Sequence, residues 1–286
     1  MATFTILGAG MMGSALAVPL VERGHEVRLV GTHLDEAIVG SLRKERFHPT
    51  LRMALPEGIQ PLSHHELDGA LDGADFLALG VSSAGLNWAC AELAPRLRHG
   101  TPVFMITKGM RFEGGRMRVF VDVVADALPQ AQGVAAIGGP CIAGELARRV
   151  PTCVVVAGRD RGFLEGLCEI LRGSFYFPVL DDDPVGAEVC SALKNAFAMG
   201  VAIAAGLHER DGGEPGSVAT HNVESAVFAQ SVLEMQRVIR RVGGRPDGAA
   251  WLSGAGDLDV TNNGGRTGRF GRWLGRGVGL AQAVAN

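Results

Sequence analysis

Cysteine is scarce in this sequence, and so are aromatic side chains. Aromatic residues make up 6% of the 286 residues. The five cysteines show no C-x-x-C or C-x-x-H spacing and are Cys90, Cys141, Cys153, Cys168 and Cys190. This pattern predicts neither a disulfide framework nor a zinc site, so we interpret the cysteines as small buried residues and expect no metal. The adjacent pair His64 and His65 is interpreted as a solvated turn.

Strong net charge, basic clusters and long apolar runs are also lacking. The formal net charge is −3 at pH 7, and no cluster of Lys and Arg suits a nucleic-acid backbone, so we expect no nucleic-acid partner. The first residues form an apolar strand rather than a basic leader, and no apolar run approaches the roughly 20 residues that span a bilayer. We therefore expect a cytoplasmic protein without a membrane span.

What the sequence does contain is a large apolar fraction, arranged in alternating strand-like and helix-like segments. Hydrophobic residues make up 47% of the chain and charged residues 20%, and 286 residues suffice for two modest domains. The strand-like runs cover residues 3–7, 26–30, 75–81, 102–106, 133–138, 152–157 and 174–180. Their alternation with helical patterns predicts an α/β fold of the Rossmann type, with a doubly wound parallel sheet and helices on both faces.

The pattern changes after the last of these runs. From about Pro184 onward, periodic apolar stretches such as 185–207 and 223–242 predict helices and no strand. Asp182 or Asp183 can cap the first of these helices, with Pro184 in its first turn. The C-terminal part is therefore predicted to be all-helical.

A glycine-rich turn follows the first strand-like run. Gly8 permits a tight turn, Gly10 lets the backbone approach a diphosphate, and Gly13 lets a helix pack closely on the strand. Met11 and Met12 open this helix, whose first N–H groups and dipole suit an anion. Because the second strand-like run follows at βαβ spacing, the motif predicts a bound dinucleotide.

Together these patterns divide the chain into two parts. We predict a dinucleotide-binding domain over residues 1–182 and a helical substrate-binding domain over residues 183–286. Glycine-rich segments at 212–216 and 264–265 are predicted to be loops.

The end of the second strand-like run bears on the choice of cofactor. An Asp or Glu at this place binds the 2′-hydroxyl of NAD, but this chain has Thr32 and His33 there. The first carboxylates are Asp35 and Glu36, and no arginine stands at the turn to bind a 2′-phosphate. We expect NAD or NADP as the cofactor, with NADP tolerated through Thr32 and His33.

Further segments resemble the soluble NAD(P)-dependent glycerol-3-phosphate dehydrogenases along nearly the whole chain. The matching segments, in order, are the glycine turn 8–13, Pro49 with Leu55-Pro56, Thr107-Lys108-Gly109, Gly139-Pro140, Pro151-Thr152, Leu193-Lys194-Asn195, Gly254-Ala255-Gly256-Asp257-Leu258, and Gly264-Gly265-Arg266 with Phe270-Gly271. The resemblance implies hydride transfer between NAD(P)H and dihydroxyacetone phosphate or glycerol 3-phosphate, a step of glycerophospholipid metabolism.

Reduction of a ketone needs a cation or an acid beside the developing alkoxide. In the resemblance, Lys194 matches the family's catalytic lysine on the first long C-terminal helix, and Lys108 matches a second lysine at a strand end. The two are expected to approach the substrate from opposite domains. Burial beside another cation would lower the pKa of Lys194 toward the working range.

A structural interpretation stands beside the catalytic one for both lysines. A lysine next to Asn195 on a helix is most often a surface residue, and Lys108 can be a solvated side chain at a strand end. The segment 187–206 is otherwise so apolar that Glu188, Lys194 and Asn195 form polar islands on a largely buried helix. Because buried charge needs a partner, this pattern favours the catalytic interpretation of Lys194.

Two further residues are assigned to the site by the resemblance. Asp257 matches an aspartate that holds the lysine ammonium, and Gly254 and Gly256 before it imply a close backbone approach. A helix N-cap is the alternative role for Asp257. Thr261 matches a threonine that orients the substrate, and its alternative is an ordinary helix or turn residue.

Arg266 matches the arginine that binds the substrate phosphate, a role that suits a planar guanidinium. Asn195 and Thr267 complete the expected substrate-binding set, and Gly264-Gly265 is expected to provide a flexible loop. The family places asparagine where Thr267 stands, and threonine lacks the second donor of a carboxamide.

Two other functions therefore stay open. One is a related NAD(P)-dependent reductase of a different small hydroxy or keto compound, and the other is a dinucleotide-binding protein without catalysis. The hydroxyacid dehydrogenases with the same two-domain plan place asparagine several residues after their helix lysine, whereas this chain has Asn195 adjacent and Ala198 further along.

The chain departs from the family pattern at two more places. Cys141 and Ile142 stand where the family has a serine and an aromatic residue, and the chain ends at Asn286, before the family's last helices. We expect a partner subunit, as in a homodimer, to cover the apolar surface that this leaves.

Overall fold

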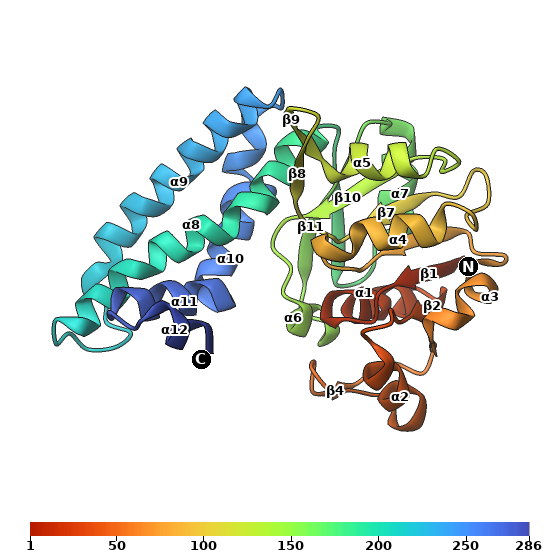
Figure 1. The fold of residues 1–286 in the computed structure, drawn as a ribbon, viewed down its shortest axis with the longest axis horizontal. Coiled ribbons are helices and arrows are strands. Elements are labelled where there is room, and N and C mark those ends of the chain that lie inside the picture. Colours follow the sequence, from red (N-terminus) through yellow and green to blue (C-terminus); the bar gives the residue numbers. More distant parts are fainter. Residues whose placement is uncertain (286) are drawn as a thin grey trace. The chain divides into compact units, whose positions relative to one another are not determined.

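The computed structural model describes residues 1–285, and the chain divides into two compact units. The sheet unit, Met1–Pro184, contains an eight-stranded sheet with helices, and the helical unit is Val185–Asn286 (Figure 1). Between Val185 and residue 285 the structure has helices, turns and bends but no strand, as the sequence predicted.

The main sheet has the strand order β12-β11-β10-β7-β6-β1-β2-β5. Its strands are β1 Thr3–Leu7, β2 Glu26–Val30, β5 Ile59–Leu62, β6 Phe76–Leu79, β7 Val103–Met105, β10 Val134–Gly138, β11 Thr152–Gly158 and β12 Tyr176–Asp181. Each of the predicted strand-like runs corresponds to one of these strands. Neighbouring strands are parallel except β10 and β11, which run antiparallel, so the prediction of a wholly parallel sheet is wrong at this pair.

The antiparallel pair follows from the lack of a full crossover helix between its strands. The chain between β10 and β11 contains only the five-residue helix α6, Ala143–Ala147, which packs on α1. A parallel connection usually crosses the face of the sheet through a full helix, and the five-residue α6 is too short to do so. Without a crossover helix, β11 begins at the end of the sheet where β10 finishes and runs in the opposite direction.

Strand β5 and two hairpins were not predicted from the sequence. β5 contains Pro61, which cannot donate to a ladder, but β5 lies at the edge of the sheet, where proline is tolerated. One hairpin pairs β3 Phe47–His48 with β4 Met53–Ala54. The other pairs β8 Met110–Glu113 with β9 Arg116–Val119 through two glycines at positive φ, a typical tight hairpin turn.

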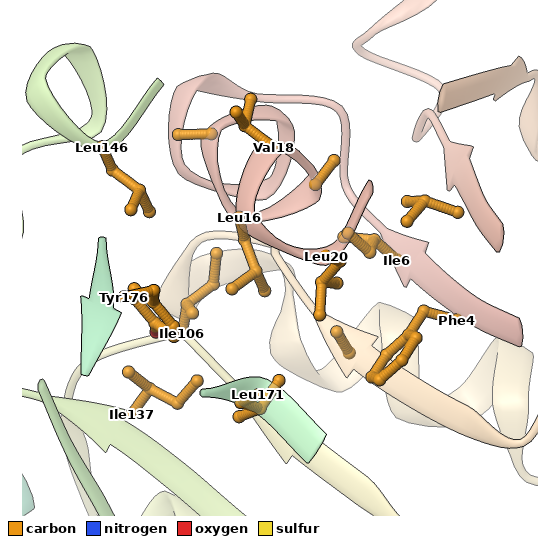
Figure 2. Packing of buried hydrophobic residues seen from close by; sticks show 14 of the residues in the cluster. Phe4, Ile6, Leu16, Val18, Leu20, Ile106, Ile137, Leu146, Leu171 and Tyr176 are labelled. Carbon is orange, nitrogen blue, oxygen red and sulfur yellow. The ribbon is translucent and has the colours of Figure 1, made fainter. Parts of the chain in front are cut away.

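Helices cover both faces of the sheet because alternate strand residues point to opposite sides. Phe4, Ile6 and Phe104 face a core with α1, α2, α6 and α7, whereas Leu7 and Met105 face a core with α3, α4 and α5. Figure 2 shows the first core, where side chains of α1 lie against those of β1. The helices of this unit are α1 Met11–Glu22, α2 Glu36–Glu45, η1 His64–Glu66, α3 Leu67–Leu71, η2 Ser83–Gly85, α4 Leu86–Leu93, α5 Phe120–Ala127, α6 and α7 Arg161–Leu171.

The helical unit is built around the long helix α8. Its helices are α8 Pro184–Arg210, η3 Val218–Thr220, α9 His221–Arg241, η4 Pro246–Ala250, the π-helical turn η5 Leu252–Gly256, α10 Asp257–Gly264, α11 Arg266–Gly275 and α12 Leu280–Ala285. Pro184 is the first residue of α8, as predicted, because its missing N–H has no partner in a first turn anyway.

Helix α8 is long and apolar enough to cross a bilayer by length and composition alone. An 18-residue window has a mean hydropathy of 1.4, so the prediction that no apolar run approaches this length is wrong. Of this 18-residue window, a share of 39% is buried inside the protein. Core helices of globular proteins have the same character, and the close contact of α8 with α11 accounts for it here.

Glycines bring α8 and α11 into backbone contact. A Cβ on Gly271 would lie 2.2 Å from the Met199 carbonyl oxygen, and one on Gly275 would lie 2.4 Å from that of Ile203. Both contacts advance by four residues along each helix, so the two helices run in the same direction. This register places the start of α11 beside Asn195.

Candidate active site

The glycine turn has the geometry that a dinucleotide-binding turn requires. Gly8 has a φ of +118°, and a Cβ on it would lie 2.7 Å from the carbonyl carbon of Gly80. A Cβ on Gly13 would lie 2.0 Å from the Gly8 carbonyl oxygen. Gly10 is the N-cap of α1, and a Cβ there would meet nothing within 4 Å, so its backbone faces open space. The turn thus fits a closely approaching diphosphate.

The turn also lies where doubly wound sheets bind ligands. The chain leaves β1 toward β2 and β5 on one side and later returns to β6 and β7 on the other. The carboxyl ends of β1 and β6 therefore flank the topological switch point. Met11 is 41% exposed at the helix start, whereas Met12 packs against the core, so the two predicted methionines differ in role.

The end of β2 shows a contact that the sequence analysis missed. Oδ2 of Asp35 accepts hydrogen bonds from the Thr32 N–H at 2.8 Å, the Thr32 hydroxyl at 2.9 Å and the Ala9 N–H at 3.2 Å. Asp35 therefore ties the end of β2 to the glycine turn. His33 is exposed, and its ring lies edge-on to Trp88 with centroids 5.2 Å apart. The spacing Thr-x-x-Asp is the sequence signal that could have indicated this loop.

Lys108 follows β7 in the sheet unit. Its Nζ donates to the Gly139 carbonyl at 3.3 Å, and its side chain is partly buried. Because β7 and β10 are parallel neighbours and Gly139 follows β10, this bond links two carboxyl ends of the sheet. Lys108 thus lies at the ligand-binding edge.

The helical unit pairs Lys194 with Asp257. Lys194 Nζ donates to Asp257 Oδ1 at 2.5 Å, and the two side chains are 13% and 0% exposed. This is the pairing that the resemblance implied for Asp257. Asp257 begins α10 directly after the π-helical turn, where a Cβ on Gly254 would lie 2.1 Å from the Ala249 carbonyl oxygen. π-helical turns are frequent at functional sites.

The predicted substrate-binding residues lie around the start of α11. The Thr267 hydroxyl donates to Asn195 Oδ1 at 3.4 Å, and Arg266 is exposed as the first residue of the helix. Thr261 is buried, and its hydroxyl donates to the Asp257 carbonyl at 2.6 Å, within its own helix. This bond is the ordinary helical role that the sequence left open.

The predicted flexible loop at 264–265 is wrong. Gly264 is the last residue of α10, and Gly265 alone separates it from α11 as the N-cap. A Cβ on Gly265 would lie 2.3 Å from the Thr261 carbonyl oxygen, so the glycine permits a sharp, closely packed bend. Arg266 is therefore presented by a helix start rather than by a loose loop.

The helical unit also contains a polar cavity of about 430 Å³ that the sequence analysis did not anticipate. Neither Lys194 nor Asp257 lines it; its walls include His208, Glu209, His221, Glu224, Asn262 and Arg272. Arg272 pairs with Glu209, which is 5% exposed. Among residues 1–285, no group of three or more His, Cys, Asp or Glu side chains could hold a metal ion.

These features define the class of the protein. A glycine turn at the switch point of a Rossmann-type sheet, with a helical unit that holds a buried lysine–carboxylate pair, is typical of a dinucleotide-dependent dehydrogenase. The family model of the NAD-dependent glycerol-3-phosphate dehydrogenase N-terminus matches residues 3–164, and that of the C-terminus matches residues 183–286. The chain belongs to the NAD-dependent glycerol-3-phosphate dehydrogenase family, which confirms the resemblance.

Individual relatives agree with this assignment. The chain is 34% identical over 281 residues to the NADP(+)-dependent glycerol-3-phosphate dehydrogenase of Archaeoglobus fulgidus, covering 98% of this chain and 82% of the relative. It is 31% identical over 283 residues to glycerol-3-phosphate dehydrogenase [NAD(P)+] of Xanthomonas campestris, covering 98% and 78%. The crystal structure of glycerol-3-phosphate dehydrogenase from Coxiella burnetii superposes with a TM-score of 0.84 at 30% identity, covering 99% and 83%.

Proposed function

We propose that this protein is an NAD(P)-dependent glycerol-3-phosphate dehydrogenase that interconverts dihydroxyacetone phosphate and glycerol 3-phosphate. Family membership over both units supports the reaction. The observation that carries the chemistry is the buried ion pair between Lys194 and Asp257, which suits a substrate carbonyl. Asn195, next to Lys194 in sequence, contacts Thr267, which follows the exposed Arg266, so a substrate phosphate can be bound at the start of α11.

Lys194 acts as the acid and electrophile of this proposal. Reduction of the ketone adds a hydride to carbon and a proton to oxygen, and the bound nicotinamide supplies the hydride. Lys194 places its ammonium beside the carbonyl oxygen, stabilises the growing negative charge and donates the proton. Asp257 holds the ammonium in one orientation, since its buried carboxylate accepts from Nζ at 2.5 Å. Lys108 is proposed as a second cation for the substrate.

Arg266 binds the substrate phosphate in this proposal. It stands at the first position of the ten-residue helix α11, where free backbone N–H groups and the helix dipole also favour an anion. Thr267 and Asn195, which contact one another, complete the substrate-binding set. The Thr261 hydroxyl donates its proton within its own helix, so its proposed part in substrate binding is limited to accepting a hydrogen bond.

The sheet unit, residues 1–182, is proposed to bind the cofactor and residues 183–286 the substrate. Gly8, Gly10 and Gly13 provide the turn for the diphosphate, with Met11 and Met12 at the helix start. We expect NADP to be tolerated because Thr32 and His33, rather than an Asp or Glu, follow the end of β2, and Oδ2 of Asp35 accepts from the Thr32 and Ala9 N–H groups.

A homodimer in the cytoplasm stays our prediction for the working form. Large apolar side chains are exposed on two helices of the helical unit, with Val223 at 55% and Leu233 at 49% on α9, and Leu280 at 66% and Val284 at 72% on α12. A second subunit would cover such side chains. Light scattering on the purified protein measures the oligomeric state.

The test of the reaction is the change in nicotinamide absorbance when the protein is mixed with dihydroxyacetone phosphate and NADH or NADPH. Turnover with either cofactor is expected. Turnover only with a non-phosphorylated ketone would support a related reductase, for which Thr267 is the motivating departure. Tight cofactor binding without turnover would indicate a silent dinucleotide-binding protein.

A further inference from the structure

The glycine turn of the sheet unit is held by side chains outside the glycine motif, and one of them is His48. His48 ends the short strand β3, and its side chain is fully buried. Its Nε2 lies 3.1 Å from the carbonyl oxygen of Ala9, and the Leu51 N–H donates to its Nδ1 at 3.1 Å. Because Nδ1 accepts this bond, the ring is neutral, and its single proton lies on Nε2 and is donated to Ala9.

Other side chains hold the same residue of the turn. The Ser14 hydroxyl also donates to the Ala9 carbonyl at 3.0 Å, and Asp35 accepts from the Ala9 N–H. Both polar backbone groups of Ala9 are thus bonded. The Ala9 carbonyl belongs to the peptide plane whose N–H is that of Gly10, and in a trans peptide these two groups point in opposite directions. A bond that fixes the carbonyl therefore also aims the Gly10 N–H.

We propose that His48 is a positioning residue for the cofactor, which aims the Gly10 N–H at the diphosphate by holding the Ala9 carbonyl. The inference rests on the proposed dinucleotide binding by the sheet unit. Gly10 is the N-cap of α1 and faces open space, so its N–H is one of the first donors that an arriving anion meets. A leucine in place of His48 fills a similar volume but cannot donate.

The chain offers a matched control in a second buried histidine. His25 is 7% exposed, its Nδ1 accepts from the Ala2 N–H at 3.2 Å, and its Nε2 lies 3.3 Å from the Ile170 carbonyl oxygen. It has the same bonding pattern as His48 but directly precedes β2, at the opposite end of the strand from the glycine turn. Replacement of His25 therefore removes the same two hydrogen bonds of a buried histidine and should lower stability, but it leaves the glycine turn unchanged.

The experiment measures the Kd for NADH by nicotinamide fluorescence, together with Tm, for wild type, His48→Leu, His48→Gln and His25→Leu. Both leucine variants are expected to lower Tm, but only His48→Leu should raise Kd, by about tenfold, because the Ala9 carbonyl keeps only its bond from Ser14 and no longer aims the Gly10 N–H. His48→Gln keeps a donor and should recover most of the affinity. An equal Kd in wild type and His48→Leu, or an equal rise in His25→Leu, overturns this inference alone. Wild type that binds no dinucleotide overturns the proposed function as well.

A pH series on wild type keeps the inference testable if His48→Leu does not fold. Burial lowers the pKa of His48. The charged groups around it are Asp35, the N-cap of α2, Arg52 on the turn after β3, and Arg148, the C-cap of α6, which donates to the Leu51 carbonyl. The first turn of α1 carries no charge. Protonation would turn Nδ1 into a donor facing the Leu51 N–H. Because burial holds the pKa of His48 below the ordinary histidine value of about 6.5, the Kd for NADH should rise only at pH values below that value. His48→Gln should lack this rise, and an identical pH profile in the two proteins overturns the inference.

Discussion

Replacement of Lys194 by methionine separates the catalytic and structural roles of the buried ion pair. Methionine keeps much of the length of lysine but has no charge and no proton to donate. The change leaves the fully buried Asp257 carboxylate without its 2.5 Å partner. We therefore expect the variant to lose both turnover and stability, and we expect that a second substitution can restore only the stability.

The magnitudes follow from the burial of the pair. Removing one partner of a buried ion pair costs about 3–5 kcal/mol of the free energy of unfolding, because an uncompensated charge remains inside. Loss of the acid and of its electrostatic stabilisation should lower kcat by about 10²–10⁴-fold. Lys194→Ala should lose as much turnover, and cofactor binding should change little because the glycine turn belongs to the sheet unit.

The double variant Lys194→Met/Asp257→Asn decides between the roles. It removes both charges at nearly constant shape, so the free energy of unfolding in urea should recover most of the loss, whereas kcat, followed by nicotinamide absorbance, should not recover. A single variant Lys194→Met that folds and retains kcat within about tenfold of wild type would refute the assignment of Lys194 as the acid. Recovery of turnover in the double variant would show that the pair is structural.

Three further outcomes are expected. Arg266→Lys keeps the charge but loses paired hydrogen bonds, so initial-rate kinetics should give a KM for dihydroxyacetone phosphate about tenfold higher than that of wild type. Thr267→Asn should lower that KM. An unchanged KM in both variants would show that the substrate phosphate does not bind at the start of α11. Gly13→Ala places a Cβ 2.0 Å from the Gly8 carbonyl, so fluorescence titration should show at least about tenfold weaker NADH binding, and wild-type affinity would contradict the proposed fit. Burial lowers the pKa of His25 and His48, so the unfolded chain takes up protons that the folded chain does not. The free energy of unfolding, measured in urea, should therefore fall as pH falls below about 6.5. A free energy of unfolding that rises at lower pH would contradict this sign.

The sequence indicated the architecture of the sheet unit because strands and glycine turns leave local patterns. Each predicted strand is present, and α1 begins at Met11 directly after the turn. β5 was missed because Pro61 is atypical of strands and is tolerated only by the edge position. The antiparallel entry of β11 depends on where α6 packs, and no local pattern carries that information.

The site was only partly predictable for the same reason. The apolar surroundings of Lys194 indicated a buried charge that needs a partner, but they did not identify the partner from the residues themselves. Family resemblance indicated Asp257, and it said nothing of Asp35 or His48, whose roles are contacts with Ala9 across 26 and 39 residues of chain. The packing of α11 on α8 brings Thr267 to Asn195. In the sequence, the only sign of this packing is the spacing of Gly271 and Gly275 in α11.

The sequence by itself determined the positions of most strands of the main sheet, the glycine turn and the positions of the candidate charges, because periodicity, turn residues and charge are local properties of the chain. Tertiary structure alone decided which of these charges meet. Lys194 and Asp257 are 63 residues apart in sequence, and they form an ion pair only because α8 and the π-helical turn before α10 fold into one unit that buries both side chains.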